Sequence, residues 1–232
     1  MTRQDLLLIP GLLCTSLLWE PQIAGLSDIA DMTVADHARD DTLSAIAERI
    51  LASAPSTFAL AGLSMGGYIA FEIWPQAPER LARIALLDTR ASGATDEETV
   101  RRKDLLALAE RGRFTGIHDR LIPLFVHADR LDDAALIGTI RRMAEDTGKD
   151  GFIRQTRALM ARPSSHDTCR SIDVPTLVLC GRQDALTTVS MHEEMAELIP
   201  GARLSVIEDC GHLSTLEKPE AVTREMRAWL TA

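Results

Sequence analysis

Cysteine is scarce in this chain, and its four cysteines follow no regular spacing. They form no Cys-x-x-Cys pair, and none lies near a pair of histidines. Disulfide scaffolds need dense cysteine frameworks and structural zinc sites need closely spaced Cys and His ligands, so both classes are excluded. We expect reduced, mostly buried thiols and no bound metal; the cysteines are Cys14, Cys169, Cys180 and Cys210.

An excess of positive charge is also lacking, since 25 Lys and Arg residues face 34 Asp and Glu residues, for a formal net charge of −9. Nucleic acids and anionic membranes attract basic surfaces, so we expect neither as a partner. No apolar run approaches the roughly 20 residues of a membrane span, and the run at Leu6–Ile9 is too short for a signal peptide. The sequence therefore predicts a soluble cytoplasmic protein, with its oligomeric state left open.

Short apolar runs alternate with helical patterns over most of the chain, which is typical of βαβ units around a parallel sheet. Strands are expected at 6–9, 32–35, 58–61, 81–88, 176–180 and 203–207. Helices are expected near 17–26, 43–52, 68–73, 191–198 and 219–230. Because functional sites of open parallel sheets lie beyond the carboxyl ends of the strands, the loops there are the ones to inspect.

The interval 91–170 interrupts this alternation, because it contains helical patterns, near 100–110 and 132–144, and no convincing strand. We therefore expect an α/β core of residues 1–90 and 171–232, with residues 91–170 inserted into it as a helical cap. The chain length permits such a single core with an insertion.

The insertion is also the one part of the chain where basic residues outnumber acidic ones, by 14 to 13. Guanidinium groups bind carboxylates through two parallel hydrogen bonds. This predicts a compact acyl group with an anionic or polar portion under the cap, although any single arginine fits a solvated outer helix face better. The arginines available are Arg101, Arg102, Arg141, Arg142, Arg154 and Arg157.

A G-x-S-x-G motif, Gly62–Gly66, lies between the apolar run 58–61 and an apolar helical stretch. In a strand-turn-helix context this motif predicts a nucleophile elbow, a turn so sharp that the serine is held in a strained conformation. Ser64 is then the nucleophile. The N–H of Met65, at the start of the helix, can face a developing oxyanion.

A carboxylate and a histidine follow this serine in chain order, each in a loop after an expected strand. Asp184 follows the strand at 176–180, and His212 follows the strand at 203–207. A serine hydroxyl needs a base to take its proton, and a carboxylate orients that base. We predict Ser64, Asp184 and His212 as the catalytic residues, with Asp88, at another strand end, as the rival to Asp184.

We expect the other five histidines to pack or to face solvent. Among them, only His127 is a candidate for the inner face of the cap. The remaining four are His37, His118, His166 and His192.

An oxyanion hole needs a second N–H beside that of Met65, and the loop after the first strand, Pro10–Leu13, can supply it. The residue after Gly11 is Leu12, which is the first candidate. Leu13 is the second, because the register of the loop is not fixed by the sequence.

Taken in order, these motifs resemble the α/β-hydrolase superfamily, and in particular its small cofactor-free esterases of the carboxylesterase, C–C hydrolase and haloperoxidase-like group. The resemblance covers nearly the whole core, while the cap is not diagnostic, and it implies a mostly parallel central sheet with helices on both faces and no cofactor. The matching segments are Pro10–Leu12, Gly62–Gly67, Pro78–Leu81, Pro175–Val178, Gly181–Asp184, Gly211–His212 and Glu217–Glu220.

The chain departs from that group in two loops. Its first strand is followed by Pro10-Gly11 where the group usually has His-Gly. The group's Asp-x-Pro-Gly-x-Gly-x-Ser run is replaced here by residues 35–41, so we expect that loop to be built differently. The leading antiparallel strands of larger relatives are also expected to be missing.

Together these features predict a serine hydrolase that cleaves a small carboxylic ester or thioester through an acyl-enzyme. Acyl transfer, carbon–carbon bond hydrolysis and perhydrolysis in the same fold are the alternatives, followed by a ligand receptor that retains the three residues. Serine at position 64 speaks against dehalogenation, which needs a carboxylate nucleophile in this fold.

Overall fold

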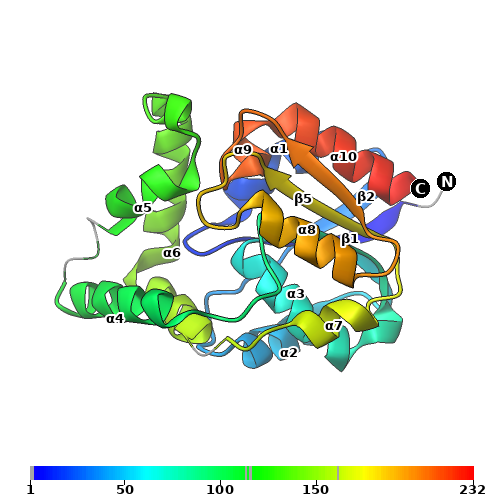
Figure 1. Ribbon diagram of the computed structural model, residues 1–232, viewed down its shortest axis with the longest axis horizontal. Coiled ribbons are helices and arrows are strands. Elements are labelled where there is room, and N and C mark those ends of the chain that lie inside the picture. The colour runs from blue at the N-terminus through cyan, green and yellow to red at the C-terminus, as the bar shows by residue number, and fades with distance from the viewer. Residues whose placement is uncertain (1–2, 113, 115–116, 161) are drawn as a thin grey trace.

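A six-stranded sheet forms the centre of the molecule, in the order β2-β1-β3-β4-β5-β6. The computed structural model (Figure 1) describes residues 3–112, 114, 117–160 and 162–232. All five strand pairings among these residues are parallel, so the predicted α/β class is confirmed. The strands are β1 (Gln4–Ile9), β2 (Ala30–Val34), β3 (Phe58–Leu63), β4 (Leu81–Leu87), β5 (Thr176–Gly181) and β6 (Arg203–Ile207).

Helices cover both faces of the sheet because alternate residues of its strands face opposite sides. On β1, Leu6 and Leu8 join one hydrophobic core, whereas Leu7 and Ile9 join a second one. The first core includes residues of η1 (Ser16–Trp19), α1 (Glu20–Leu26) and α10 (Pro219–Thr231). The second includes residues of α2 (Leu43–Ser53), α3 (Met65–Gln76), α7 (His166–Ser171) and α8 (Val189–Leu198). The short η2 (Pro78–Arg80) contacts α3, and α9 (Ser214–Glu217) packs beside η1, α1 and α10.

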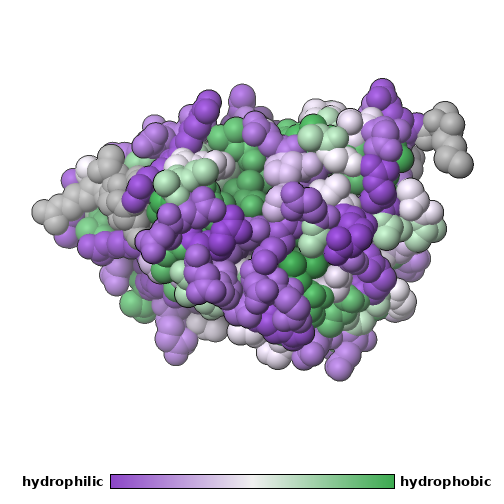
Figure 2. Space-filling model, turned by 90° about the horizontal axis from the view of Figure 1, so that it is seen from above, coloured by the Kyte–Doolittle hydropathy of each residue, from purple (hydrophilic) through white to green (hydrophobic). Residues whose placement is uncertain are grey.

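The interval between β4 and β5 is helical, and its described residues contain no strand. It holds α4 (Asp96–Glu110), α5 (Ile117–Phe125), η4 (Ala128–Arg130) and α6 (Ala134–Met160), before α7. In Figure 1 α4, α5 and α6 stand together to one side of the sheet, whereas α7 lies beneath it beside α3 and α8. The face in Figure 2 is largely hydrophilic, with hydrophobic residues gathered between this helical part and the rest.

One expected helix end was wrong. The pattern predicted a helix that ends at Ala144, but α6 continues to Met160 across a kink at Gly148, whose φ and ψ are 68° and 171°. Glycine adopts this positive φ without the steric penalty of a side chain, so two helical segments join end to end. The second segment carries Gln155 into the buried part of the molecule.

Gly66 permits the closest contact between α3 and the sheet, because a Cβ there would overlap the carbonyl oxygen of Ile9. We expect Gly66→Ala to lower the free energy of unfolding by about 1–3 kcal/mol or more, since overlap with backbone cannot be relieved by a side-chain rotation. Gly138→Ala is the matched control, because that helical glycine has no atom within 4 Å of the added Cβ. It should raise stability by about 0.5–1 kcal/mol. Urea unfolding of both variants makes the comparison, and equal stability of the two would contradict it.

Candidate active site

Ser64 lies between β3 and α3 with φ of 54° and ψ of −111°, a conformation that few non-glycine residues adopt. The backbone around it is held firmly. Its N–H donates to the carbonyl of Leu87 at 2.9 Å, and its carbonyl accepts from the Thr89 hydroxyl at 2.9 Å. These contacts fix the Ser64 side chain at the carboxyl end of the sheet.

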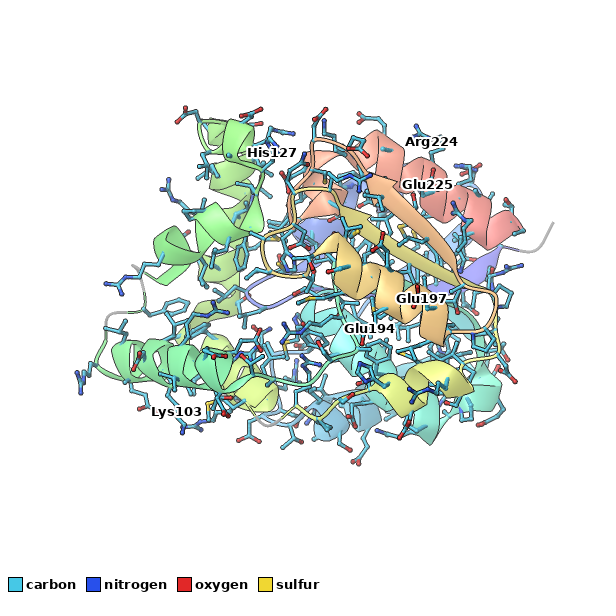
Figure 3. All side chains as sticks on the ribbon, viewed as in Figure 1. Lys103, His127, Glu194, Glu197, Arg224 and Glu225 are labelled. Atoms are coloured by element: carbon cyan, nitrogen blue, oxygen red, sulfur yellow. The ribbon has the colours of Figure 1, made fainter. Side chains whose placement is uncertain are left out.

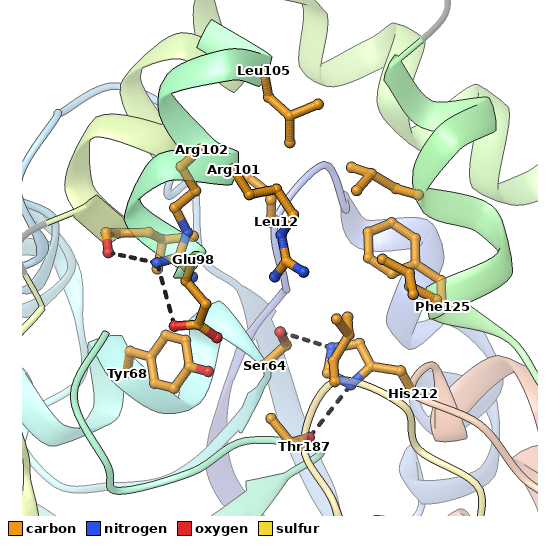
Figure 4. Close-up of a pocket in the computed structure, with 14 residues that line it drawn as sticks. Leu12, Ser64, Tyr68, Glu98, Arg101, Arg102, Leu105, Phe125, Thr187 and His212 are labelled. Carbon is orange, nitrogen blue, oxygen red and sulfur yellow. Dashed lines mark hydrogen bonds and ion pairs between the residues drawn. The ribbon is translucent and has the colours of Figure 1, made fainter. Parts of the chain in front are cut away.

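His212 lies within hydrogen-bonding distance of both Ser64 and Asp184 (Figure 4 shows the first contact). Its Nε2 is 2.9 Å from Ser64 Oγ, and its Nδ1 is 2.7 Å from Asp184 Oδ2. The ring is buried, and its backbone N–H donates to the carbonyl of Phe125 at 3.1 Å. Phe125 ends α5 and stacks on the imidazole with ring centroids 6.1 Å apart, so the helical insertion helps to position His212.

Asp184 is itself fixed by its own loop. Its Oδ1 accepts from the backbone N–H groups of Leu186 and Thr187 at 2.8 and 2.9 Å, and its Oδ2 accepts from the Thr187 hydroxyl at 2.6 Å. Burial raises the pKa of Asp184, but the charge and hydrogen bond of His212 and the bonds from Thr187 outweigh it, and the pKa is lowered. Burial likewise lowers the pKa of His212, and the Asp184 charge reverses this, so that pKa is raised.

Asp88, the rival carboxylate, has different partners. Its Oδ1 accepts from the Gly181 N–H at 3.1 Å, and its Oδ2 lies 2.5 Å from the Ser214 hydroxyl. Within the described chain it makes no hydrogen bond to His212. Burial, and then the nearby charge of Asp184, raise the pKa of Asp88 well above its ordinary value. The structure thus places Asp184 against His212. Asp88, at the end of β4, instead links β5 and the His212 loop through its hydrogen bonds to Gly181 and Ser214.

The loop after β1 presents two candidate N–H groups, and they differ in their partners. The Leu13 N–H donates to Gln155 Oε1 at 3.0 Å, so it is occupied. No hydrogen bond from the Leu12 N–H to a protein group occurs among the described residues, and Leu12 lines the same pocket as Ser64. Met65 is the first residue of α3, where a helix leaves its N–H groups without helical partners.

Gln155 and His37 brace this loop from behind, and neither was predicted from the sequence to do so. His37 Nε2 is 2.9 Å from the Gly11 carbonyl and 3.0 Å from Gln155 Nε2. Burial lowers the pKa of His37, which favours the neutral ring. Because Gln155 Oε1 accepts from Leu13, its Nε2 is the donor, and a neutral His37 Nε2 either accepts from Gln155 or donates to the Gly11 carbonyl. His37 lies in the loop 35–41, where the sequence departs from the family pattern. That departure was the one feature of the sequence that could have drawn attention to His37.

The remaining histidines lie apart from Ser64. His192 is buried, where it accepts from the Thr89 N–H at 3.1 Å. His127 does not line the pocket; its backbone N–H donates to Glu217 at 2.7 Å, beside the His212 loop (Figure 3). His166 lies 3.2 Å from Glu194 in an ion-pair position, and the side chain of His118 falls outside the described residues.

A pocket of about 90 Å³ opens above Ser64 (Figure 4). Its walls combine apolar side chains of the helical insertion, such as Leu105, Leu121 and Phe125, with the polar groups of the site. The structure brings only Arg101 and Arg102 of the six predicted arginines to this pocket. Figure 3 places Lys103 on the outer side of α4, away from it.

In the described part of the chain, no group of three or more His, Cys, Asp or Glu side chains is placed to hold a metal ion. All four cysteines are buried and free. No described helix is both long and apolar enough to cross a membrane.

Curated relatives of this chain include enzymes that act on esters and lactones. The 3-oxoadipate enol-lactonase 1 of Acinetobacter baylyi is 27% identical over 224 residues, which cover 88% of this chain and 79% of the relative. The pimeloyl-[acyl-carrier protein] methyl ester esterase of Aromatoleum aromaticum is 26% identical over 250 residues, which cover 95% of both chains.

Solved structures agree with this grouping. A thermophilic esterase from Thermogutta terrifontis superposes with a TM-score of 0.89 at 29% identity, over 99% of this chain and 90% of that one. The enol-lactonase from Burkholderia xenovorans gives a TM-score of 0.90 at 25% identity, over 100% of this chain and 93% of that one. The family model described as alpha/beta hydrolase fold matches residues 6–219. This chain therefore belongs to the α/β-hydrolase fold family.

Proposed function

We propose that this protein is a serine hydrolase of small carboxylic esters. The observation that carries the proposal is the continuous contact from Ser64 Oγ through His212 to Asp184, at 2.9 and 2.7 Å, beneath an open pocket. Relatives named as esterases and enol-lactonases support the reaction class. The same chemistry extends to thioesters and lactones, which present an equivalent carbonyl.

His212 acts as the general base in this proposal, and Asp184 orients it. Nδ1–H donates to Asp184, which leaves Nε2 free to accept the Ser64 proton. Because the pKa of Asp184 is lowered, its carboxylate is ionised at neutral pH and stabilises the imidazolium that forms. Asp88 is assigned a structural role, because it accepts hydrogen bonds from Gly181 and Ser214 and makes none to His212 among the described residues.

The Leu12 and Met65 N–H groups form the oxyanion hole. Leu12 is preferred to Leu13 because the Leu13 N–H is already bonded to Gln155. Gln155 and His37 then act as positioning residues, since they hold the loop that presents Leu12. Each donor to the oxyanion is worth about 3–4 kcal/mol in comparable sites.

The reaction proceeds through an acyl-enzyme. Ser64 Oγ bonds to the ester carbonyl carbon while its proton moves to His212 Nε2, and the carbonyl oxygen becomes an oxyanion. Collapse breaks the bond to the alkoxy oxygen, which leaves as the alcohol with the proton from His212. A water molecule then attacks the acyl group, gives its proton to His212, and releases the carboxylic acid as Ser64 recovers the proton.

The pocket favours a compact acyl group. Its volume of about 90 Å³ is several times the roughly 10–15 Å³ that one water molecule requires. Its apolar walls suit a short carbon chain, and a long acyl chain would extend beyond them.

Ser64→Ala should fold normally and lose hydrolysis of a p-nitrophenyl ester by several orders of magnitude, because the nucleophile is absent while the oxyanion hole remains. Ser27→Ala, at an exposed serine of another loop, is the control. Circular dichroism checks the folding of both variants. Turnover by well-folded Ser64→Ala at the wild-type rate would refute the mechanism.

Asp184→Asn should lower kcat by the order of 10³- to 10⁴-fold, because the amide no longer fixes the tautomer or compensates the charge of His212. Asp88→Asn is the matched variant and should keep most of the activity, since Asp88 makes no hydrogen bond to His212 among the described residues. Steady-state kinetics of the two variants decides the assignment. A larger loss of kcat in Asp88→Asn than in Asp184→Asn would refute the assignment of Asp184.

The pH dependence follows from the raised pKa of His212. Only neutral His212 accepts the Ser64 proton, so kcat/KM should rise with pH through an apparent pKa above the ordinary value of 6.5 and fall in acid. Because Asp184 causes the increase, the residual activity of Asp184→Asn should titrate at a lower pH. A profile that is flat across this region, or unmoved by Asp184→Asn, would argue against His212 as the base.

A further inference from the structure

Positive charge collects on one side of the pocket, where four arginines surround a single carboxylate. Arg101 and Arg102 line the pocket on α4, together with Glu98 and Tyr68. Arg90 and Arg162 lie close to these residues, and the charges of Arg90, Arg102 and Glu98 all influence Arg162. Arg90 and Arg162 are buried and Arg102 is half-buried, whereas Arg101 is exposed. Charges held away from water are stable only when they are paired, so the positive charge behind the pocket requires an explanation.

Arg162 shows the imbalance most clearly. The residue is 4% exposed, and no hydrogen-bond partner is described for any of its three guanidinium nitrogens. Its guanidinium carbon lies 3.8 Å from the centre of the Tyr68 ring, so a cation–π contact provides its stabilisation. Burial, together with the charges of Arg90 and Arg102, lowers the pKa of Arg162.

Glu98 is shared between two other arginines. Arg90 Nη2 donates to Glu98 Oε2 at 2.5 Å, and Arg102 Nη1 lies 3.8 Å from the same oxygen. Arg102 also donates to the carbonyl of Leu159 at 3.1 Å, which fixes it against α6. One negative charge therefore serves both groups and leaves nothing for Arg101 or Arg162.

Arg101 is the group that can meet a ligand. Within the described residues its guanidinium takes part in no hydrogen bond or ion pair. Figure 4 shows it descending from α4 into the pocket above Ser64. Its five N–H donors are arranged to hold a carboxylate through two bonds.

The direction of the reaction places the anion on the acyl side. His212 must give its proton to the departing alcohol, so the alcohol leaves on the His212 side of Ser64. In Figure 4 Glu98, Arg102 and Tyr68 lie on the side of Ser64 opposite His212. A carboxylate that Arg101, above Ser64, holds toward Arg102 therefore belongs to the acyl chain.

We infer that the preferred substrates are esters whose short acyl chain ends in a carboxylate, bound by Arg101 in the positive field of Arg102 and Arg162. This inference rests on the proposed ester hydrolysis and names its substrate class. The free carboxylate neutralises the excess charge of the pocket, and the alcohol portion remains open to variation.

The test compares two methyl esters of the same shape, monomethyl glutarate and its neutral isostere methyl 4-carbamoylbutanoate. The wild-type protein should favour the carboxylate by roughly 10-fold or more in kcat/KM, as expected for a hydrogen bond to a charged group. Raised ionic strength should reduce that preference, because the pocket is open to solvent ions. Arg101→Gln should abolish it mainly through KM, because it weakens binding of the carboxylate ester far more than binding of the neutral ester. Arg142→Gln, at an exposed arginine of α6, is the matched control and should keep the wild-type preference.

The outcomes separate this inference from the proposed function. Equal kcat/KM for the two esters, both lost in Ser64→Ala, would overturn the inference alone. A carboxylate preference that survives Arg101→Gln would also overturn it. Titration calorimetry with glutarate gives a readout independent of turnover, and binding weakened by Arg101→Gln but not by Arg142→Gln is expected. Binding of glutarate without hydrolysis of any ester would contradict the proposed function instead.

Discussion

Close backbone contact between α3 and the sheet is the constraint on which the site depends. A Cβ at Gly62 would overlap the backbone of Gly66, and one at Gly66 would overlap Ile9 of β1. With both positions free of side chains, α3 begins directly above the strands and Ser64 takes its strained turn. A second close contact lies between the loops of Asp184 and His212, because a Cβ at Gly181 would overlap the carbonyl groups of Cys210 and Gly211. The loops that carry Asp184 and His212 therefore cross at contact distance.

The helical insertion completes this arrangement rather than merely covering it. Phe125 accepts hydrogen bonds from the backbone of His212 and Leu213, and Gln155 accepts one from Leu13. Residues of the helical insertion thus hold both the His212 loop and the loop after β1 in place. A displacement of α5 or α6 would move the imidazole or the oxyanion loop as well as the pocket wall.

Much of the fold was predictable because hydrophobic periodicity is a local property. The six strands and the helical interval between β4 and β5 follow the expected pattern. The G-x-S-x-G motif, two strand ends and the chain order predicted Ser64, Asp184 and His212. The extent of α6 was not predictable, because Gly148 continues a helix that glycine more often ends. The proposed preference for Leu12 over Leu13 rests on the hydrogen bond from Leu13 to Gln155, which lies 142 residues away along the chain.

The arginines show the same limit. Charge counting indicated a basic insertion, yet Arg154 donates to the carbonyl of Ala38 and Arg157 pairs with Glu110, both away from the pocket. Arg162 was overlooked because its burial against Tyr68 is set by tertiary packing. The sequence shows which charged residues are present, but only the fold shows which of them lack an ion-pair or hydrogen-bond partner.

Trapping of the acyl-enzyme tests the central claim most directly. The protein is mixed with p-nitrophenyl butyrate, quenched in acid within the first turnover and digested for mass spectrometry. The account predicts a burst of p-nitrophenol equal to the enzyme concentration and a butyryl group on the peptide that contains Ser64. A butyryl group on another residue, or hydrolysis with neither a burst nor an adduct under single-turnover conditions, would contradict it.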